Sequence, residues 1–347
     1  MPPLNLLISD LRYRVVIATG GIGSGTFFAM DGNHTLGREE SRGGRFLDQR
    51  DYCKLHIITH YIKILLGPGF PTILIGKVGE DAWGRRLLEE MQATGLDTRH
   101  VAICPGEQTM TSVCFLYPDG SGGNLTASDS ACNRVDAAFV AQAEAYFARF
   151  TGQGVALAAP EVPLAARHKL LELATAYGFL RAASFTSGEI HQAARQGLLD
   201  LTDLLSINLD EAAALLPSPA TETTPELVFR AALERLQGIN PAMRVLLTAG
   251  KRGSWAWDGT QANHQPAFPA QVASSAGAGD ASLAAIIVGL AAGLTLFQAQ
   301  ELASLAAAYS VTSPHTIHPG LERDALEGFA RGAGVKLSKE VCRLLES

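Results

Sequence analysis

The chain has 347 residues and a formal net charge of −6, from 28 Lys and Arg against 34 Asp and Glu. Hydrophobic residues make up 47% of it and charged residues 18%, a globular composition that excludes a disordered chain. The mild acidity, without any Lys/Arg run, argues against a nucleic-acid partner, and five scattered cysteines without a CxxC motif indicate neither zinc nor a disulfide framework.

Short aliphatic runs alternate along the chain with segments of helical length. The predicted strands are Val15–Ala18, Thr72–Ile75, Val155–Ala158, Leu204–Asn208 and Val245–Thr248. The predicted helices are Tyr52–Leu66, Ala82–Ala93, Leu164–Tyr177 and Pro225–Gln237. This alternation predicts an α/β fold, in which a mainly parallel sheet is covered by helices on both faces. Ligands of such sheets bind at the carboxyl ends of the strands.

Two stretches, at about residues 20–45 and 100–132, lack the helical pattern and read as strands and turns. We expect them to pair into a small β-sheet, a lid over the site, within one domain that spans residues 1–347. The edge of such a sheet favours association, so a homodimer through the lid is a further expectation.

The segment Ser274–Asp280 (SSAGAGD) is followed directly by the apolar helix predicted at Ala281–Ala292. Small residues at a helix start let backbone N–H groups approach an anion, and the helix dipole adds positive charge there. Asp280 could then accept a proton from a substrate hydroxyl while those N–H groups hold a phosphoryl group. The alternative is an ordinary helix in which Asp280 is a favourable first-turn residue.

Two further segments lie where a predicted strand ends. Asn208 and Glu211 offer oxygen atoms that could hold Mg²⁺ through its water ligands. The segment TAGKRG, at 248–253, offers a second loop that could approach phosphate.

With these motifs in place, the chain resembles the ribokinase-like (PfkB-type) carbohydrate kinases. The resemblance rests on GKVGEDAWGRRLLEEMQATGLDT (76–98), NLDE (208–211), TAGKRG (248–253) and SSAGAGDASLAAII (274–287), and it extends from about residue 57 onward. It implies a three-layer α/β/α core, ATP and Mg²⁺ as cofactors, and a small sugar-like acceptor.

The resemblance also implies a role for individual residues. Asp280 would be the catalytic base, and Gly277, Ala278 and Gly279 would form the anion hole. Asn208 and Glu211 would organise Mg²⁺ and the nucleotide phosphates. The nucleotide site would further include Thr248, Gly250, Gly253 and His315.

Three departures from the family pattern affect the cation and the acceptor. Ser274 stands where the family often has an aspartate that helps to hold a monovalent cation, which leaves potassium dependence open. The stretch Gly20–Gly25 has no counterpart of the sugar-binding aspartate. The family's GGxxxN pattern is reduced to a glycine pair without the asparagine, so the expected acceptor contacts are Gly43, Gly44 and Arg45.

Arg42, Arg45 and Arg50 are close in sequence to that expected acceptor site. They could bind an anionic acceptor, such as a sugar phosphate or sugar acid, because Arg binds phosphate and carboxylate groups in a bidentate manner. Alternatively, they are solvated residues of an exposed loop.

The expected function is ATP-dependent phosphorylation of a hydroxyl group on a sugar or sugar-like molecule. The alternatives are a nucleoside kinase and a degenerate family member that binds a nucleotide or metabolite without turnover. No secretory signal or membrane-spanning segment is recognisable, so we expect the protein in the cytoplasm, without a membrane partner.

Overall fold

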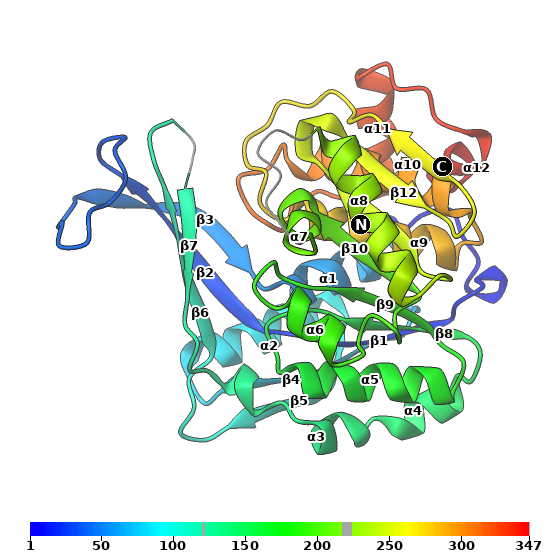
Figure 1. The fold of residues 1–347 in the computed structure, drawn as a ribbon, viewed down its shortest axis with the longest axis horizontal. Helices are drawn as coiled ribbons and strands as arrows, with labels where there is room; N and C mark the ends of the chain where they lie inside the picture. The colour runs from blue at the N-terminus through cyan, green and yellow to red at the C-terminus, as the bar shows by residue number, and fades with distance from the viewer. Residues whose placement is uncertain (120–121, 217–223, 347) are drawn as a thin grey trace.

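The computed structural model describes residues 1–119, 122–216 and 224–346, and two sheets organise them (Figure 1). The larger sheet of this described part has nine strands in the order β13-β12-β11-β10-β9-β8-β1-β4-β5, and within it only β12 is antiparallel to its neighbours, β11 and β13. Its strands are β1 (Val15–Thr19), β4 (Thr72–Gly79), β5 (Asp97–Cys104), β8 (Gly154–Ala158), β9 (Leu180–Ser184), β10 (Leu204–Asn208), β11 (Arg244–Thr248), β12 (Ser254–Trp257) and β13 (Ala262–Gln265).

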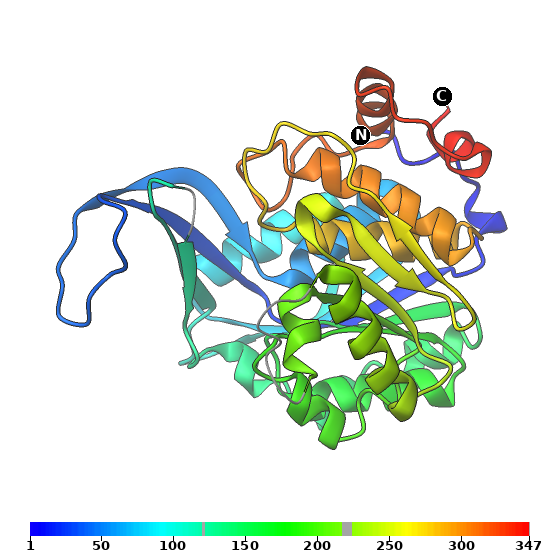
Figure 2. The ribbon, with the colours of Figure 1, turned by 45° about the horizontal axis from the view of Figure 1, so that its top comes forward.

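Helices cover both faces of this sheet, as Figure 2 shows. One face carries α1 (Lys54–Leu66), α2 (Ala82–Thr94), α9 (Ala278–Ala291) and α10 (Leu296–Ser310), with α11 (Arg323–Gly332) and α12 (Lys339–Leu345) packed against α10. The other carries α3 (Ala137–Ala141), α4 (Glu144–Arg149), α5 (Leu164–Ala176), α6 (Ile190–Arg195), α7 (Leu209–Ala214) and α8 (Pro225–Ile239). Short 3-10 turns are η1 (Ile8–Asp10), η2 (Ala131–Arg134) and η3 (Gly250–Arg252).

The side chains of β1 show why both faces are apolar. Val16 and Ala18 belong to the core on the α9 side, whereas Val15 and Ile17 belong to the core on the α5 side. Successive side chains of a strand point to opposite faces, so a strand buried on both sides is a continuous apolar run. The predicted α/β fold with a mainly parallel sheet is confirmed.

The smaller sheet, which we call the lid, has the order β3-β2-β6-β7. Its strands are β2 (Gly23–Met30), β3 (Gly44–Tyr52), β6 (Met110–Leu116) and β7 (Gly122–Thr126). It projects from the side of the main sheet where the parallel strands end (Figure 1). The expected lid segments differ in extent from these strands, because β3 continues to Tyr52 and β5 belongs to the main sheet.

Two helix boundaries also differ from expectation. Helix α1 begins at Lys54, since Tyr52 is the last residue of β3, and α9 begins at Ala278, so Asp280 lies inside its first turn. Within the described part of the chain, no helix has both the length and the apolar character that crossing a bilayer requires.

Candidate active site

The amino terminus of α9 is built around Gly277. Its φ angle is 81°, in the left-handed region, and a Cβ at this position would lie 2.4 Å from the carbonyl oxygen of Thr316. An L side chain would therefore meet both backbone strain and a steric clash. Only glycine fits this turn without rearrangement of the neighbouring segment.

The turn leaves backbone donors free. No side chain caps α9, and the N–H groups of Gly277, Gly279 and Asp280 have no hydrogen-bond partner among the described residues. Unpaired amides and the helix dipole make such a terminus an anion site. Thr248, at the carboxyl end of β11, lies beside it, since a Cβ on Gly279 would be 3.9 Å from its hydroxyl oxygen. The structure thus brings Gly277, Ala278, Gly279, Asp280 and Thr248 together.

Asp280 is almost entirely buried, with 8% of its surface exposed. Burial raises the pKa of its carboxyl group, whereas the ammonium group of Lys54 lowers it. The Nζ atom of Lys54 is 3.6 Å from Oδ1 of Asp280, and the same charge also acts on Glu211 and Glu161. Lys54 therefore places a positive charge near three carboxyl groups and favours their ionised forms.

Glu161 is the second unusual carboxylate. Its φ angle of 75° makes it the one non-glycine residue with positive φ in the described part of the chain. It follows β8, and Gly21 leaves room for it, since a Cβ on Gly21 would lie 2.4 Å from the Cβ of Glu161. Its Oε2 atom is buried and has no hydrogen-bond partner among the described residues. Burial raises its pKa to about 7. A strained residue with an unpaired buried oxygen is typical of a ligand-binding position.

Asp51, near the end of β3, adds a carboxylate from the lid. Its Oδ2 atom accepts hydrogen bonds from Ser112 Oγ at 3.2 Å and from Cys114 Sγ at 3.3 Å. Burial raises the pKa of Asp51, and its charge contributes to the raised pKa of Asp280. Asp51 therefore faces the same region as the start of α9.

Asn208 and Glu211 form the capping box of α7. The backbone N–H of Asn208 donates to Glu211 Oε2 at 2.8 Å, and the backbone N–H of Glu211 donates to Asn208 Oδ1 at 2.9 Å. Among the described residues, Glu211 Oε1 accepts no hydrogen bond, and no group of three or more His, Cys, Asp or Glu side chains there could hold a metal ion by itself. The donor set fits a hydrated Mg²⁺ that keeps most of its own water, and it does not fit an all-protein cage.

The remaining expected nucleotide residues occupy two loops. Gly250 is the first residue of the turn η3 after β11, and Gly253 directly follows that turn. His315 lies after α10 and accepts a hydrogen bond at Nδ1 from the Arg50 amide of the lid at 3.0 Å. Thr316, next to it, donates its amide to the Arg50 carbonyl at 3.1 Å. These bonds connect the loop after α10 to the lid.

The expected acceptor residues Gly43, Gly44 and Arg45 are not brought to Asp280. They lie at the outer end of β3, where Gly44 pairs with Met30 and Arg45 is exposed. The neighbouring arginines are committed to ion pairs: Arg42 with Glu40 at 2.7 Å, and Arg50 with Glu90 at 3.6 Å.

Sequence reasoning missed Lys54, Asp51 and Glu161. Glu161 carried a usable signal, because it follows a predicted buried strand at the edge where ligands bind. Lys54 and Asp51 carried none, since each reaches the site through pairing of the lid and packing of α1 against α9.

The chain is similar to known sugar kinases in sequence and in fold. A sequence model of the pfkB family carbohydrate kinases matches residues 63–323. The chain is 28% identical over 245 residues to fructoselysine 6-kinase of Escherichia coli (strain K12), and the matched region covers 67% of this chain and 80% of the relative. Ribokinase of Arabidopsis thaliana, solved with ribose and ATP, has a TM-score of 0.71 at 20% identity, covering 91% of this chain and 98% of that one. A protein described as a ribokinase II from E. coli, solved with ATP and Mg²⁺, has a TM-score of 0.72 at 19% identity, covering 91% and 99%.

These matches define a phosphotransferase that uses an alcohol group of a sugar as acceptor. The family model covers more than half of the chain. The chain belongs to the pfkB family of carbohydrate kinases.

Proposed function

We propose that the protein transfers the γ-phosphoryl group of ATP to a hydroxyl group of a sugar or sugar-like molecule, with Asp280 as the base. The observation that carries this proposal is the position of Asp280 in the first turn of α9, buried and beside unpaired amides. Phosphoryl transfer needs positioning and charge neutralisation more than covalent help from the protein, and this terminus supplies both.

In the proposed reaction, Asp280 orients the acceptor hydroxyl and takes its proton. The acceptor oxygen forms a bond to the γ-phosphorus as the bond from that phosphorus to the ADP oxygen breaks. The free amides of Gly277 and Gly279 hold the transferring group, and Thr248 contacts the nucleotide phosphates. Mg²⁺, held through water by Glu211 and Asn208, would supply neutralisation of the phosphate charge.

For the acceptor side, Glu161 and Asp51 are the proposed contacts for sugar hydroxyl groups. Carboxylates accept hydrogen bonds from hydroxyls, and Oε2 of Glu161 is an unused acceptor. Since Arg42 and Arg50 are already paired with glutamates, we propose an acceptor without an anionic group near the lid. Gly250, Gly253 and His315 remain proposed nucleotide contacts.

A phosphotransfer screen tests the proposal. Purified protein, ATP and Mg²⁺ are incubated with neutral sugars, sugar–amine conjugates, sugar phosphates and nucleosides, and ADP formation is measured. We expect turnover with a neutral sugar or sugar conjugate. Turnover confined to nucleosides would identify the alternative nucleoside kinase, and ATP binding without turnover on any acceptor would identify a non-catalytic member.

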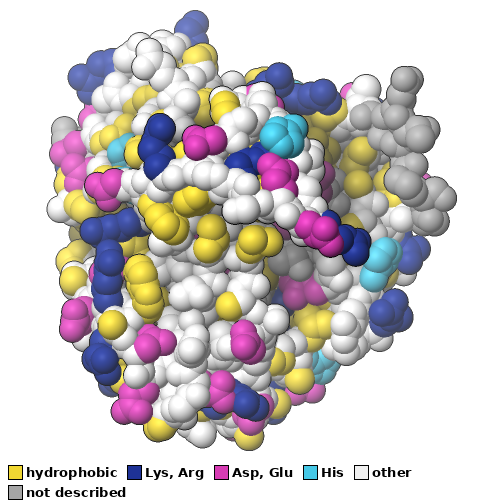
Figure 3. Space-filling view, turned by 90° about the vertical axis from the view of Figure 1, so that its left-hand side faces the viewer, with side chains coloured by type: hydrophobic (Ala, Val, Ile, Leu, Met, Phe, Trp, Pro, Cys, Tyr) yellow, Lys and Arg dark blue, Asp and Glu magenta, His cyan; other side chains and the backbone are white. Residues whose placement is uncertain are grey.

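We also propose that the lid mediates a homodimer. Phe46, Val113 and Leu125 are exposed hydrophobic residues of the lid strands. Figure 3, which faces the lid side, shows a group of hydrophobic side chains in the middle of this surface with charged residues around it. Exposed apolar residues on an open sheet favour pairing with a second copy. Sedimentation of the Leu125→Lys variant tests this, because a lid-mediated dimer would dissociate and an unrelated dimer would not.

A further inference from the structure

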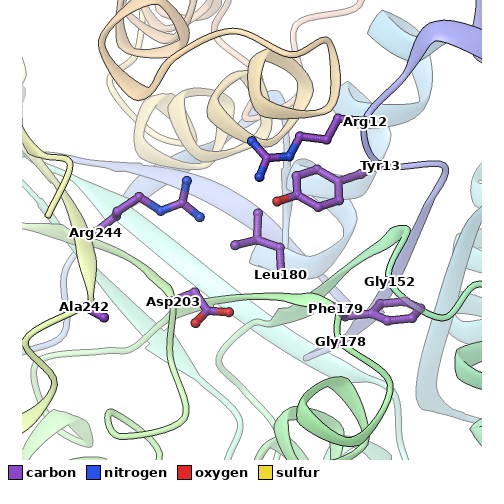
Figure 4. A pocket seen from close by; sticks show the side chains of 9 residues that line it. All are labelled: Arg12, Tyr13, Gly152, Gly178, Phe179, Leu180, Asp203, Ala242 and Arg244. Carbon is purple, nitrogen blue, oxygen red and sulfur yellow. The ribbon is translucent and has the colours of Figure 1, made fainter.

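A pocket of about 370 Å³ lies at the end of the main sheet opposite to the start of α9 (Figure 4). It is lined by Arg12, Tyr13, Gly152, Gly178, Phe179, Leu180, Asp203, Ala242 and Arg244. Each of these residues lies within three positions of the start of β1, β8, β9, β10 or β11. The cavity is therefore at the amino ends of the parallel strands, whereas Asp280 and Thr248 lie at their carboxyl ends.

The wall of this cavity is held by backbone hydrogen bonds between neighbouring strand starts. The Arg244 amide donates to the Asp203 carbonyl at 2.9 Å, and the Asp203 amide donates to the Arg181 carbonyl at 2.8 Å. Arg181 also compensates the only carboxylate in the wall, since its Nε atom and its amide both donate to Asp203 Oδ2 at 2.9 Å. The negative charge of Asp203 is thus balanced by Arg181.

Two positive charges remain. Neither Arg12 nor Arg244 has an ion-pair partner among the residues that the structure describes. Figure 4 shows their guanidinium groups on opposite sides of the cavity, with the hydroxyl group of Tyr13 directed into the space between them. Leu180 lies below this space, and the ring of Phe179 points away from it. The arrangement offers cationic donors from two sides, a hydroxyl group and one apolar side chain.

We propose that this cavity binds a small phosphate ester at a site separate from the catalytic centre. Guanidinium groups bind phosphate oxygens through paired, charge-assisted hydrogen bonds, and two of them match the charge of a phosphate dianion. The volume accommodates a phosphate group together with a few carbon atoms, which could contact Leu180. Strands of five residues rise about 3.3 Å per residue, so about 16 Å of sheet separates the two sites.

Titration calorimetry with glycerol 3-phosphate tests the proposal. The active site is first saturated with a non-hydrolysable ATP analogue and Mg²⁺, and glycerol serves as the uncharged control. We expect one site for glycerol 3-phosphate, none for glycerol, and at least tenfold weaker binding in both Arg12→Gln and Arg244→Gln, as expected for the loss of a charge-assisted hydrogen bond.

Arg14→Gln is the matched control, because Arg14 is exposed and does not line the cavity. It should bind as the parent does, and so should Asp280→Asn. The proposal is overturned if no binding occurs up to about 10 mM, a concentration that detects even millimolar affinity. It is equally overturned if both cavity variants bind normally, if Asp280→Asn abolishes binding, or if the dicarboxylate malonate binds and glycerol 3-phosphate does not. Thermal unfolding of each variant verifies that it is folded.

Discussion

The ammonium group of Lys54 lies 3.6 Å from the carboxylate of Asp280, although the two residues are 226 positions apart in the chain (280 − 54). Lys54 is the first residue of α1, and Asp280 lies in the first turn of α9. The two helices pack against one another, so both amino-terminal turns meet at the carboxyl edge of the main sheet. The proposed base, which is buried and must be ionised to act, is thereby given a counter-charge.

Replacing Lys54 by Met should raise the pKa of Asp280, because the attraction that favours the charged form is removed while burial remains. Since a base must be deprotonated to act, the acidic limb of the pH profile of kcat/KM should move to higher pH by about one unit. Lys54→Arg keeps the charge and should leave the limb in place. An unchanged profile in Lys54→Met would show that this ion pair does not control the base.

Asp280→Asn should lower kcat by about 10²- to 10⁴-fold, the usual contribution of a general base. The affinity for ATP should change by no more than a few-fold, because the anion-binding amides belong to the backbone. Steady-state kinetics and fluorescence titration of a nucleotide analogue measure the two quantities. Asp210→Asn, which removes an exposed carboxylate of the same region, is the control. Comparable kcat values for Asp280→Asn and the parent would remove the base assignment.

Gly277→Ala and Gly293→Ala form a matched pair at the two ends of α9. Both glycines have positive φ angles, 81° and 84°, but a Cβ meets Thr316 at 2.4 Å only at position 277 and meets nothing within 4 Å at position 293. Gly293→Ala should therefore cost about 1 kcal/mol of unfolding free energy, and Gly277→Ala about 3 kcal/mol. Only Gly277→Ala should also lower kcat. Urea unfolding and kinetics test this, and equal stability losses would contradict the steric argument.

Glu161→Gln should change how stability depends on pH. The pKa of Glu161 is about 7 in the folded protein and about 4.3 in an unfolded chain, so between these values the folded state binds the extra proton. Stability from this group is present below about pH 4.3 and is lost as pH rises through 7. The neutral Gln has no charged form to lose stability as pH rises, so the variant should be more stable than the parent by about 3–4 kcal/mol at pH 8 and by about 1 kcal/mol at pH 5.

Urea unfolding at pH 5 and pH 8 measures that difference, and Glu172→Gln, at an exposed position, is the control. The same Glu161→Gln variant should have a raised KM for the sugar, as expected where a strained, buried group serves binding at the expense of stability. A pH-independent difference between variant and parent would contradict the raised pKa.

The main sheet could be predicted because its evidence is local. Val15–Ala18 is a continuous apolar run, and a strand buried on both faces has that pattern in almost any context. The lid strand β3 could not be predicted in the same way, since Arg45, Asp48 and Arg50 lie within it and its surroundings are largely exposed. Without a buried face, a strand has no hydrophobic period to detect.

The residues of the candidate site also differ in whether the sequence alone predicts them. Gly277 and Asp280 are close in the sequence and form a motif, so the sequence alone predicts the glycine turn that starts α9 and its proposed role in holding phosphate. The proposed acceptor contacts are residues that only the folded chain brings together: Glu161 follows β8, and Asp51 pairs with Gly25 across the lid. Gly25 lies in the stretch that lacks the family's aspartate, so a carboxylate from the partner strand stands next to that vacant position.

Thr316 contacts both the start of α9 and the base of the lid. Its carbonyl oxygen closes over Gly277, while its amide and hydroxyl group bond the Arg50 carbonyl and the Tyr52 amide at the base of the lid. The base of the lid is therefore anchored to the turn at the start of α9. A movement of the lid that kept this anchor would bend the lid farther out, where β2 and β3 lose register between Thr26 and Phe27. The outer parts of its strands could then move over the proposed sugar site while the start of α9 stayed in place.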